Sequence, residues 1–289
     1  MYAAAWDLSV RWLLEDAVFG AGEPPLAAAA RRAGHHVQRW QPQWAELLAV
    51  DEAPPMGPTG PMEHDEPLMF HGSLELAARL AAAPRWRPGA FCDTARLAHS
   101  AWATAVQPHL ANPRHRVVTV AQLVADPLRV AGDLAVDGRI FVRPDSPLKP
   151  FSGRVVELTG LTAATLDHGF YYDDLELPIV VAPVQALGAE WRVVVAGRHV
   201  VTASAYQARG RVALTDPVPA EVTDFAGMLA VELAQAGAQP DPLYVLDVVA
   251  SPRGLRLLEL NPLSGADLYA CSADAVVAAV AQACRACPA

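Results

Sequence analysis

The sequence predicts an α+β protein that divides into two domains or lobes. A chain of 289 residues is long enough to bury a full core and to form more than one unit. Its hydrophobic content of 53%, against 18% charged residues, is typical of a globular protein. Helix and strand patterns alternate in the N-terminal part, whereas the C-terminal part contains two hairpin patterns and a long amphipathic helix.

The N-terminal third reads as the start of an α/β unit. Apolar residues recur at helical spacing before Gly20 and again before Gly34, and short apolar runs follow. Ser73 is the expected N-cap of a helix rich in alanine and leucine. In chain order we expect a strand at 2–6, helices at 9–19 and 25–33, a strand at 36–40, a loop at 51–67, a strand at 68–71 and a helix at 74–83.

An irregular segment leads into the second domain. Residues 84–89 carry Trp86 between two arginines and show no periodicity. They form either an anion-binding or substrate-contacting loop, or a loop that the tryptophan anchors to the core while the arginines are solvated. Residues 96–106 read as a helix, and the Asn112-Pro113 pair interrupts the pattern. We therefore expect two domains, at 1–115 and 116–289.

The second domain begins with a helix and continues mostly as short strands. Thr119 and Gln122 have the spacing of a capping box, which begins a short helix before Pro127. Gly197 separates two apolar strand patterns and indicates a tight hairpin. The further elements expected are strands at 139–143, 154–158, 178–183, 190–195 and 198–205, and helices at 161–168, 222–235 and from 268 onward.

The most informative stretch, near the C-terminus, has two apolar runs around a turn that contains proline and glycine. A hairpin centred on Arg253 places Asp247 opposite Glu259, and the period of two places Asn261 on the same face as Glu259. Two carboxylates about 5 Å apart repel each other by roughly 3 kcal/mol at an effective dielectric of about 20. A metal ion, a protonated carboxyl or an ion pair must offset this repulsion. Arg256 is near in sequence, but parity places it on the opposite face.

Three basic residues interrupt or border apolar strands. Arg143 ends one strand, Lys149 lies in the turn after it, and Arg192 lies within another strand on the same face as Glu190. A charge buried in such an apolar strand needs a partner. Arg192 either pairs with Glu190 or the hairpin carboxylates, or binds the phosphate oxygens of a nucleotide. Together with oxygen ligands that suit Mg²⁺, these cations are the groups that phosphoryl transfer requires.

Charge, apolar runs and cysteines exclude several classes of protein. The formal net charge of −9 argues against a duplex nucleic-acid partner. No apolar run approaches the length of a membrane span and the N-terminus lacks a basic region, so we expect a cytoplasmic location and no membrane partner. The lone Cys284-x-x-Cys287 pair and the histidines lack zinc-ligand spacing. Neither a nucleophile elbow nor a GxGxxG pattern is present.

These motifs resemble those of ATP-grasp proteins, and more narrowly of the ATP-grasp clade named for two arginines and one lysine. The matching stretches, in the order expected for the family, are Phe141-Val-Arg143-Pro144, Lys149-Pro-Phe-Ser-Gly153, Glu190-Trp-Arg192, Ser204-Ala-Tyr206, Tyr244-Val-Leu-Asp247-Val and Glu259-Leu-Asn261-Pro. The stretches that begin at His71 and Pro88 resemble the region before the ATP-grasp domain. The resemblance implies two α+β subdomains that hold ATP between them, preceded by a smaller α/β domain.

The resemblance also implies a role for each motif residue, with ATP and Mg²⁺ as cofactors. The implied Mg²⁺ ligands are Asp247, Glu259 and Asn261. The implied phosphate-binding and catalytic residues are Arg143, Lys149 and Arg192, the last of which stabilises the transferring phosphoryl group. Glu190 is also expected at the nucleotide. The run 180–184 takes the place of the linker whose backbone hydrogen-bonds adenine, with Val181 and Val184 as its contacts.

The implied activity is that of a Mg-ATP-dependent carboxylate–amine ligase. ATP phosphorylates a substrate carboxylate, and an amine or another nucleophile attacks the acyl phosphate. Two alternatives stay open: a kinase or ligase that acts on a non-carboxylate acceptor, and a module that binds ATP without turnover. We expect the substrate to be a small-molecule or peptide carboxylate; its identity and the oligomeric state are left open by the sequence.

Overall fold

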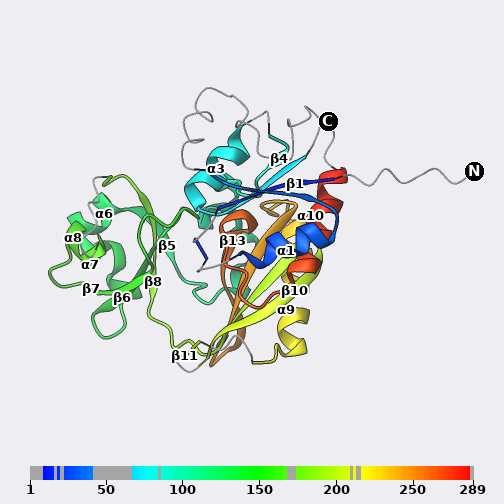
Figure 1. Cartoon of the computed structure of the whole chain (residues 1–289). Coiled ribbons are helices and arrows are strands. Elements are labelled where there is room, and N and C mark those ends of the chain that lie inside the picture. The colour runs from blue at the N-terminus through cyan, green and yellow to red at the C-terminus, as the bar shows by residue number, and fades with distance from the viewer. Residues whose placement is uncertain are drawn as a thin grey trace, which may run out of the picture.

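The computed structural model describes residues 9–15, 18–19, 23–41, 67–83, 86–167, 174–208, 211–212 and 216–286. The expected strand at 2–6 and nearly all of the expected loop at 51–67 lie outside these residues. Within them, an N-terminal parallel sheet, a central antiparallel sheet and a smaller antiparallel sheet make up the fold (Figure 1), which confirms the α+β class. In this part of the chain, no helix is long and apolar enough to cross a membrane.

The N-terminal sheet is parallel and has the strand order β2-β1-β3-β4. Its strands are β1 (Arg11–Leu14), β2 (His36–Arg39), β3 (Leu68–His71) and β4 (Pro88–Gly89). Helix α1 (Pro25–Arg32) packs on one face with Trp12 and Leu14, and helix α3 (Leu74–Ala82) packs on the other with Leu13 and Phe70. Trp86 is buried in the same cluster as α3, as expected for a loop anchored by its tryptophan.

The prediction of a helix at 9–19 is wrong, because residues 11–14 form strand β1 in the interior of this sheet. Val10, Trp12, Leu13 and Leu14 are all at most 2% exposed. A strand covered on both faces is continuously apolar, so its sequence pattern cannot be distinguished from that of a short buried helix.

The next segment forms three short helices instead of the single helix predicted at 96–106. They are α4 (Thr94–Leu97), α5 (His99–Trp102) and the 3₁₀ helix η2 (Ala103–His109). The Asp93 side chain caps α4, and the extended backbone of Ala98 separates α4 from α5. Trp102 and Val106 pack against one face of the central sheet. The domain division at residue 115 stays a prediction.

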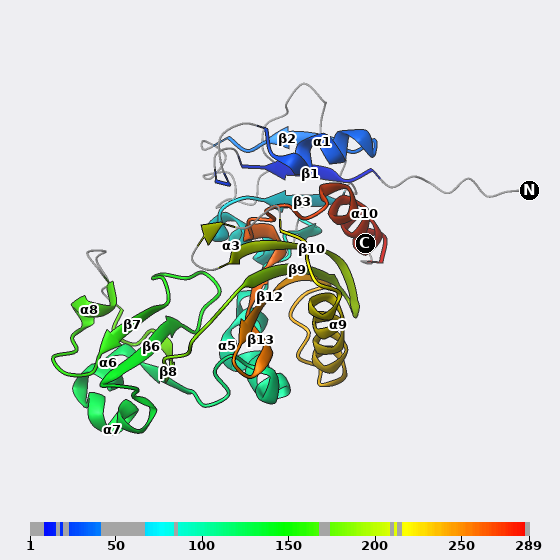
Figure 2. The same cartoon turned by 90° about the horizontal axis from the view of Figure 1, so that it is seen from below.

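The central sheet has the order β11-β10-β9-β12-β13 and is covered on both faces (Figure 2). Its strands are β9 (Glu190–Ala196), β10 (His199–Ala208), β11 (Arg211–Val212), β12 (Leu243–Ser251) and β13 (Gly254–Pro262). Helix α9 (Ala220–Gln235) packs on one face together with α5 and η2. Helix α10 (Ala273–Ala286) and β1 pack on the other, where Val194 and Val245 share a core with Trp12. The predicted hairpin around Gly197 is confirmed.

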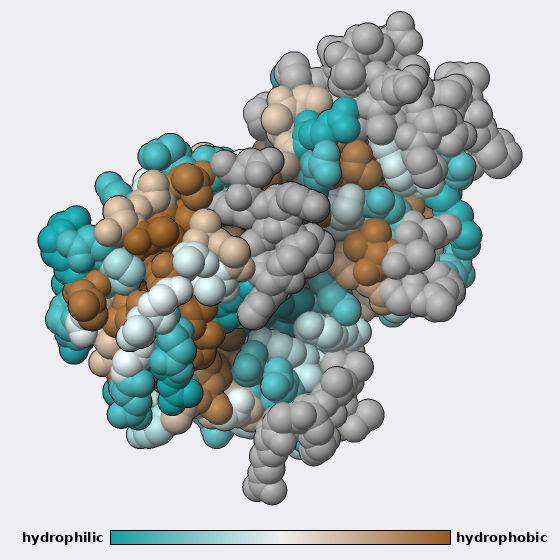
Figure 3. All heavy atoms as spheres, turned by 90° about the vertical axis from the view of Figure 1, so that its left-hand side faces the viewer, coloured by the Kyte–Doolittle hydropathy of each residue, from teal (hydrophilic) through white to brown (hydrophobic). Residues whose placement is uncertain are grey.

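The smaller sheet is antiparallel and has the order β5-β8-β6-β7. Its strands are β5 (Arg116–Thr119), β6 (Arg139–Pro144), β7 (Arg154–Glu157) and β8 (Pro178–Pro183). It is accompanied by α6 (Val120–Ala125), α7 (Pro127–Ala131), η3 (Gly132–Leu134) and α8 (Ala163–Asp167). The predicted capping box is confirmed, since Thr119 and Gln122 exchange hydrogen bonds of 3.2 and 3.0 Å. The exposed apolar side chains of this sheet and its helices include Leu128 and Val155. Figure 3 shows apolar patches on the side of the molecule that carries this sheet.

The pairing of Asp247 with Glu259 is confirmed, but it depends on a β-bulge that was not predicted. The turn of the hairpin is centred just before Arg253, which would offset the two strands by one residue. Leu258 is the extra residue on β13 that restores the predicted pairing. The bulge also reverses the parity of Arg256, which lies on the same face as Asp247 and not on the opposite face as predicted.

The N-terminal sheet meets the central sheet next to the end of β13. The 3₁₀ turn η4 (Leu263–Gly265) follows β13, and the carbonyl oxygen of Ser264 accepts a hydrogen bond from the Gly72 N–H (2.9 Å). A Cβ at Gly72 would lie 2.5 Å from the Cβ of Glu15 and 2.7 Å from the Cζ of Phe70. Only glycine fits this close approach without displacing its neighbours.

We predict that Gly72→Ala lowers the free energy of unfolding by about 1–3 kcal/mol, because the added methyl group overpacks this junction. Gly132→Ala is the matched control: a Cβ there would meet no atom within 4 Å, and the backbone is right-handed helical. Its free energy of unfolding should not fall. Urea unfolding measures both values. Wild-type stability in Gly72→Ala would contradict the close approach described here.

Candidate functional site

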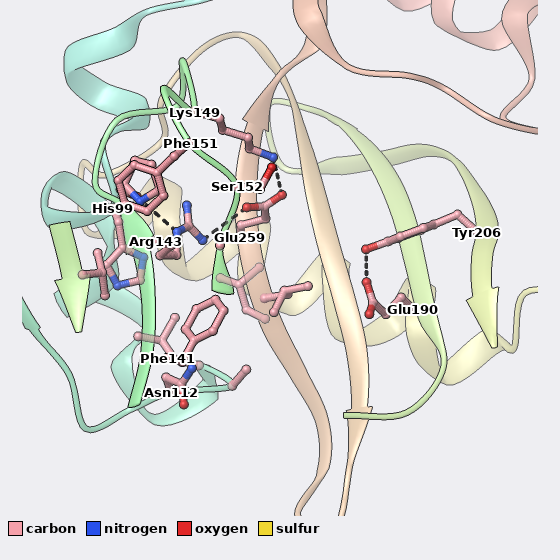
Figure 4. Close-up of a pocket in the computed structure, with 17 residues that line it drawn as sticks. His99, Asn112, Phe141, Arg143, Lys149, Phe151, Ser152, Glu190, Tyr206 and Glu259 are labelled. Carbon is pink, nitrogen blue, oxygen red and sulfur yellow. Dashed lines mark hydrogen bonds and ion pairs between the residues drawn. The ribbon is translucent and has the colours of Figure 1, made fainter. Parts of the chain in front are cut away.

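A cavity of about 310 Å³ lies between the smaller sheet and the central sheet (Figure 4). Strand β6 and the turn after it contribute Arg143 and Lys149, and β13 contributes Glu259 from the other side. The lining also includes His99, Leu110, Ala111, Asn112, Phe141, Pro144, Phe151, Ser152, Gly153, Val180, Glu190, Tyr206, Leu257 and Leu258. Side chains from both sheets and from the segment before β5 therefore surround one space.

Glu259 is the residue at which charges from the two sheets meet. Its Oε1 accepts a hydrogen bond from Lys149 Nζ (2.7 Å), and its Oε2 lies 3.2 Å from Arg143 Nη1. Asn261 Nδ2 also donates to Oε1 (3.1 Å). Burial alone would raise the pKa of this carboxyl, but the charges of Arg143 and Lys149 outweigh burial and hold the pKa at about 2. Glu259 is therefore ionised at neutral pH.

Lys149 is the only lysine among the chain's 22 lysine and arginine residues. Its side chain is 38% exposed, and its backbone is left-handed, with a φ of 50°. Non-glycine residues rarely adopt that conformation outside turns and functional sites. A compact ammonium group can turn its three donors toward several oxygens, whereas a guanidinium group presents a rigid planar fork. The single lysine thus places its ammonium group beside Glu259, where it can also reach other oxygens in the cavity.

Behind Glu259, Arg192 and Asp247 form a buried, bidentate ion pair across the β9–β12 pairing. Arg192 donates from Nε to Oδ1 (2.9 Å) and from Nη2 to Oδ2 (2.7 Å) of Asp247. Asn261 Nδ2 donates to Asp247 Oδ2 (2.8 Å) and so links this pair to Glu259. Burial raises the pKa of Asp247, and the Arg192 guanidinium opposes that rise. Burial would lower the pKa of Arg192, but the Asp247 carboxylate outweighs burial and raises it.

Three further contacts hold the guanidinium of Arg192. Its Nη1 donates to the carbonyl oxygen of Asp267 (2.6 Å). The rings of Tyr206 and Tyr269 stack at 5.1 Å and lie 5.5 and 4.9 Å from its Cζ. The Tyr206 hydroxyl donates to Glu190 Oε2, and burial raises the pKa of both groups. Arg192 therefore has a fixed position at the back of the site.

The predicted site residues fall into two layers. Those that line the cavity are Arg143, Lys149, Glu190 and Glu259. Those that lie behind it are Arg192, Asp247 and Asn261. We refer to Arg143, Lys149, Arg192, Asp247, Glu259 and Asn261 as the ion cluster. Its three cations offset the repulsion between the two carboxylates, whereas Arg256 donates to the carbonyl oxygen of Leu255. The roles of these residues in binding and catalysis stay predictions.

A second cavity, of about 660 Å³, extends the first toward the end of β8. The two share Asn112, Phe141, Glu190 and Leu258. Val184 lines the second cavity together with Val155, Gln185, Leu187, Gly188, Ala189 and Gln207. Val181 is fully buried in the core of the smaller sheet, paired on both sides by Arg116 and Val142, and lines neither cavity. The structure thus brings Val184, but not Val181, to the cavity wall.

The residues of the site that were not predicted from the sequence include His99, Asn112 and Asp145. His99 and Asn112 line the first cavity. Asp145 holds their segment in place, because its carbonyl oxygen accepts from the His99 N–H (3.0 Å) and its carboxylate from the N–H and Oγ of Ser100 (2.8 and 2.7 Å). The one sequence signal for His99 was its place on the apolar face of a helical pattern, three residues before Trp102.

The donors of the ion cluster fit Mg²⁺. Two carboxylates and an amide provide oxygen ligands of the kind that Mg²⁺ takes. Asn261 directs Nδ2 toward both carboxylates, and a half-turn of its amide would present the oxygen instead. Arg143 and Lys149 pair with both oxygens of Glu259 and compete with a metal ion for them. No group of three or more His, Cys, Asp or Glu side chains that could hold a metal ion gathers anywhere among the residues described, so the ion cluster offers two carboxylates and an amide.

Comparison with known proteins identifies the fold. A family model for the ATP-grasp domain, family 3 of the clade named for two arginines and one lysine, matches residues 72–280. A RimK domain ATP-grasp protein from Sphaerobacter thermophilus is 19% identical, with a TM-score of 0.56, and the match covers 93% of this chain and 99% of that chain. D-cycloserine synthetase DcsG is 16% identical, with a TM-score of 0.58 and coverage of 96% and 100%.

The ATP-grasp ligase PsnB, solved with a minimal precursor, is 14% identical, with a TM-score of 0.55 and coverage of 95% and 99%. PsnB has also been solved with Mg and ADP. No match was found among curated proteins. The family model and the solved structures confirm the resemblance and the ATP-grasp fold predicted from the motifs.

We predict that Glu259→Gln weakens the dependence of stability on acid pH. The pKa of Glu259 is about 2 in the folded protein and 4.5 in the absence of these partners, so its ion pairs stabilise the fold fully above about pH 4.5. That stabilisation is lost as the pH falls toward 2, by about 2 kcal/mol between about pH 7 and about pH 3.

Urea unfolding at the two pH values measures this loss. The variant should lose less stability on acidification than the wild-type protein. Glu157→Gln, at an exposed position on β7, is the control and should keep the wild-type pH dependence. An unchanged pH dependence in Glu259→Gln would show that these ion pairs do not hold the carboxyl ionised.

Proposed function

Because the chain belongs to the third family of this two-arginine, one-lysine clade of ATP-grasp proteins, we propose that it is a Mg-ATP-dependent ligase. In this proposal it activates a substrate carboxylate as an acyl phosphate, which an amine or another nucleophile attacks. The observation that carries the proposal is the ion cluster, which places three cations, two carboxylates and an amide in or directly behind the wall of one cavity. Phosphoryl transfer needs such charges at fixed positions more than it needs a covalent nucleophile.

Arg143 and Lys149 supply the positive charge that a triphosphate needs. Both reach into the cavity from the smaller sheet and pair with Glu259 (Figure 4). Phosphate oxygens accept charge-assisted hydrogen bonds from guanidinium and ammonium groups. We propose that these oxygens replace the Glu259 carboxylate as partners of both cations. Arg192 keeps its pairing with Asp247 and adds positive charge close to the transferred phosphoryl group.

This exchange of partners leaves the Glu259 carboxylate available to a metal ion. Asp247, Glu259 and Asn261 would hold Mg²⁺, the ion with which PsnB was solved beside ADP. When bound, Mg²⁺ neutralises charge on the phosphate oxygens. The chain's own contribution is to keep Arg192 in place through Asp247. Asn261, whose Nδ2 holds the two carboxylates before the metal binds, would turn its amide oxygen toward the ion.

The second cavity is the proposed site of the nucleoside. Val184 and Leu187 give it apolar walls at the end of β8, and Phe141 lies where the two cavities join. Apolar and aromatic walls suit a purine base. Glu190 lines both cavities, so we place it between the base and the phosphates. The burial of Val181 speaks against a side-chain contact with adenine.

The acceptor is proposed to be a carboxylate of a small molecule or a peptide. Solved proteins of this fold include one named for a small molecule, D-cycloserine synthetase, and a ligase that was solved with a precursor peptide. In open parallel sheets, ligands bind beyond the carboxyl ends of the strands. Here the carboxyl end of β3 meets η4, which directly follows the β12–β13 hairpin that carries Asp247 and Glu259. We propose that the acceptor approaches the ion cluster from this junction.

Incubation of the purified protein with ATP, Mg²⁺ and pools of carboxylates and amines tests the proposal. A ligase releases ADP when a suitable pair is present, and mass spectrometry shows a product condensed with loss of water. A phosphorylated product without condensation would favour the kinase alternative. Nucleotide binding without any single turnover would favour a binding module. Absence of Mg-dependent ATP binding would contradict the proposal outright.

We predict that Lys149→Ala lowers activity with little loss of stability, whereas Arg192→Ala lowers stability substantially. Lys149 is 38% exposed, so its loss should change the free energy of unfolding by less than about 1 kcal/mol. ADP formation should fall roughly 100-fold. Arg192→Ala leaves the buried carboxylate of Asp247 without its cation and should cost about 3–5 kcal/mol of stability. Urea unfolding and ADP release measure both effects, and equal losses of stability would contradict the two-layer arrangement.

We also predict that Mg²⁺ alone binds weakly, because Arg143 and Lys149 occupy the oxygens of Glu259. Since Lys149 is the only lysine, the rate at which an amine-directed reagent modifies it reports its surroundings. Mg²⁺ alone should leave that rate unchanged, whereas Mg²⁺ with ATP should lower it. An added lysine-containing peptide controls for the reagent. A changed rate with Mg²⁺ alone would show that the metal displaces Lys149 without a nucleotide.

A further inference from the structure

His99 carries polar atoms that have no partner in the protein. The residue is 5% exposed, and neither Nδ1 nor Nε2 has a hydrogen bond within the described part of the chain. Buried polar groups in native proteins are almost always hydrogen-bonded. The imidazole borders the first cavity, so its missing partner is expected to be a group that binds there.

The ring is held firmly in this position. The His99 N–H donates to the carbonyl oxygen of Asp145 (3.0 Å), which fixes the first residue of α5 to the end of β6. The ring packs edge-on against Trp102 and His115, with centroid distances of 4.8 and 4.7 Å. A ring packed in this way is oriented before a ligand arrives, which lowers the cost of ordering it on binding.

The imidazole is neutral at physiological pH. Burial, assisted by the charges of Arg143 and His115, lowers the pKa of His99 to about 3. A neutral imidazole offers one N–H donor and one acceptor. Such a weak base abstracts protons poorly near neutral pH, so the ring is suited to hydrogen bonding and not to general base catalysis.

The position of the ring indicates which group it meets. In Figure 4 His99 lies beside Arg143, between the end of the cavity at Lys149 and the end at Phe141 and Asn112. The first end carries the cations, and the second opens into the cavity proposed for the nucleoside. A nucleotide that occupies both cavities passes its phosphate chain in front of the ring.

We propose that His99 donates its imidazole N–H to a phosphate oxygen of the bound nucleotide. The proposal rests on the proposed function, in which ATP fills the two cavities. A neutral donor binds phosphate without placing a second positive charge next to Arg143. His99 is thereby assigned as a nucleotide-binding residue contributed by α5, which belongs to neither of the two antiparallel sheets.

Two substitutions test this assignment by calorimetry of Mg-ATP binding. His99→Phe removes both ring nitrogens and should weaken binding about tenfold, which corresponds to about 1.4 kcal/mol. His99→Gln keeps a neutral N–H donor and should recover most of the affinity. His109→Phe is the control, since His109 pairs with Glu232 and lines neither cavity. Wild-type affinity in His99→Phe, or an equal loss in both His99 variants, would overturn the assignment.

A measurement on the unmodified protein guards against variants that fail to fold. Nitrogen NMR of labelled histidine should show a shift of the His99 ring resonance when Mg-ATP binds. An unchanged His99 resonance in protein saturated with Mg-ATP would overturn the assignment. Failure of the wild-type protein to bind Mg-ATP at all would instead overturn the proposed function, so the two failures are distinguishable.

Discussion

The carboxylate of Glu259 is the contact on which the site depends. It accepts hydrogen bonds from Lys149, in the turn after β6, and from Asn261 of its own strand, and it forms an ion pair with Arg143 of the smaller sheet. Without these partners, its pairing opposite Asp247 would be repulsive. The contacts that offset the repulsion between Glu259 and Asp247 therefore also join the two sheets around the cavity. The ion pairs of Glu259 with Arg143 and Lys149 thus determine both the local electrostatics and the shape of the cavity.

The ion cluster has a fixed part and an exchangeable part. Arg192 and Asp247 are 9% and 1% exposed and are joined by two hydrogen bonds, so separating them would leave buried charges unpaired. Lys149 is 38% exposed, and ion pairs of partly exposed groups contribute little net stability. An incoming anion can therefore take over Lys149 at low cost, and it can pair with Arg143, which is 13% exposed, in place of Glu259, while Arg192 keeps its place. The cluster carries one net positive charge, since three cations face two carboxylates, and Arg143 and Lys149 already line the cavity in which we propose that the nucleotide binds.

The sequence predicted the elements whose own side chains fix the backbone, such as the Thr119 capping box and the strand bounded by Pro178 and Pro183. The prediction was wrong at residues 11–14, where a strand buried on both faces has the same apolar pattern as a short buried helix. Asp247 and Glu259 were singled out because charge is costly in an apolar strand, and their role as metal ligands stays a prediction. The bulge at Leu258 and the place of His99 at the cavity were not predicted, because each depends on strand register or on contacts between distant segments.

A heavy-oxygen transfer experiment tests most directly the claim that this cluster activates a carboxylate. A substrate carboxylate labelled with the heavy oxygen isotope gives up one labelled oxygen to phosphate when an acyl phosphate forms and is then attacked by the nucleophile. We expect labelled inorganic phosphate in the same amount as the condensed product. Condensed product accompanied by unlabelled phosphate would contradict the account.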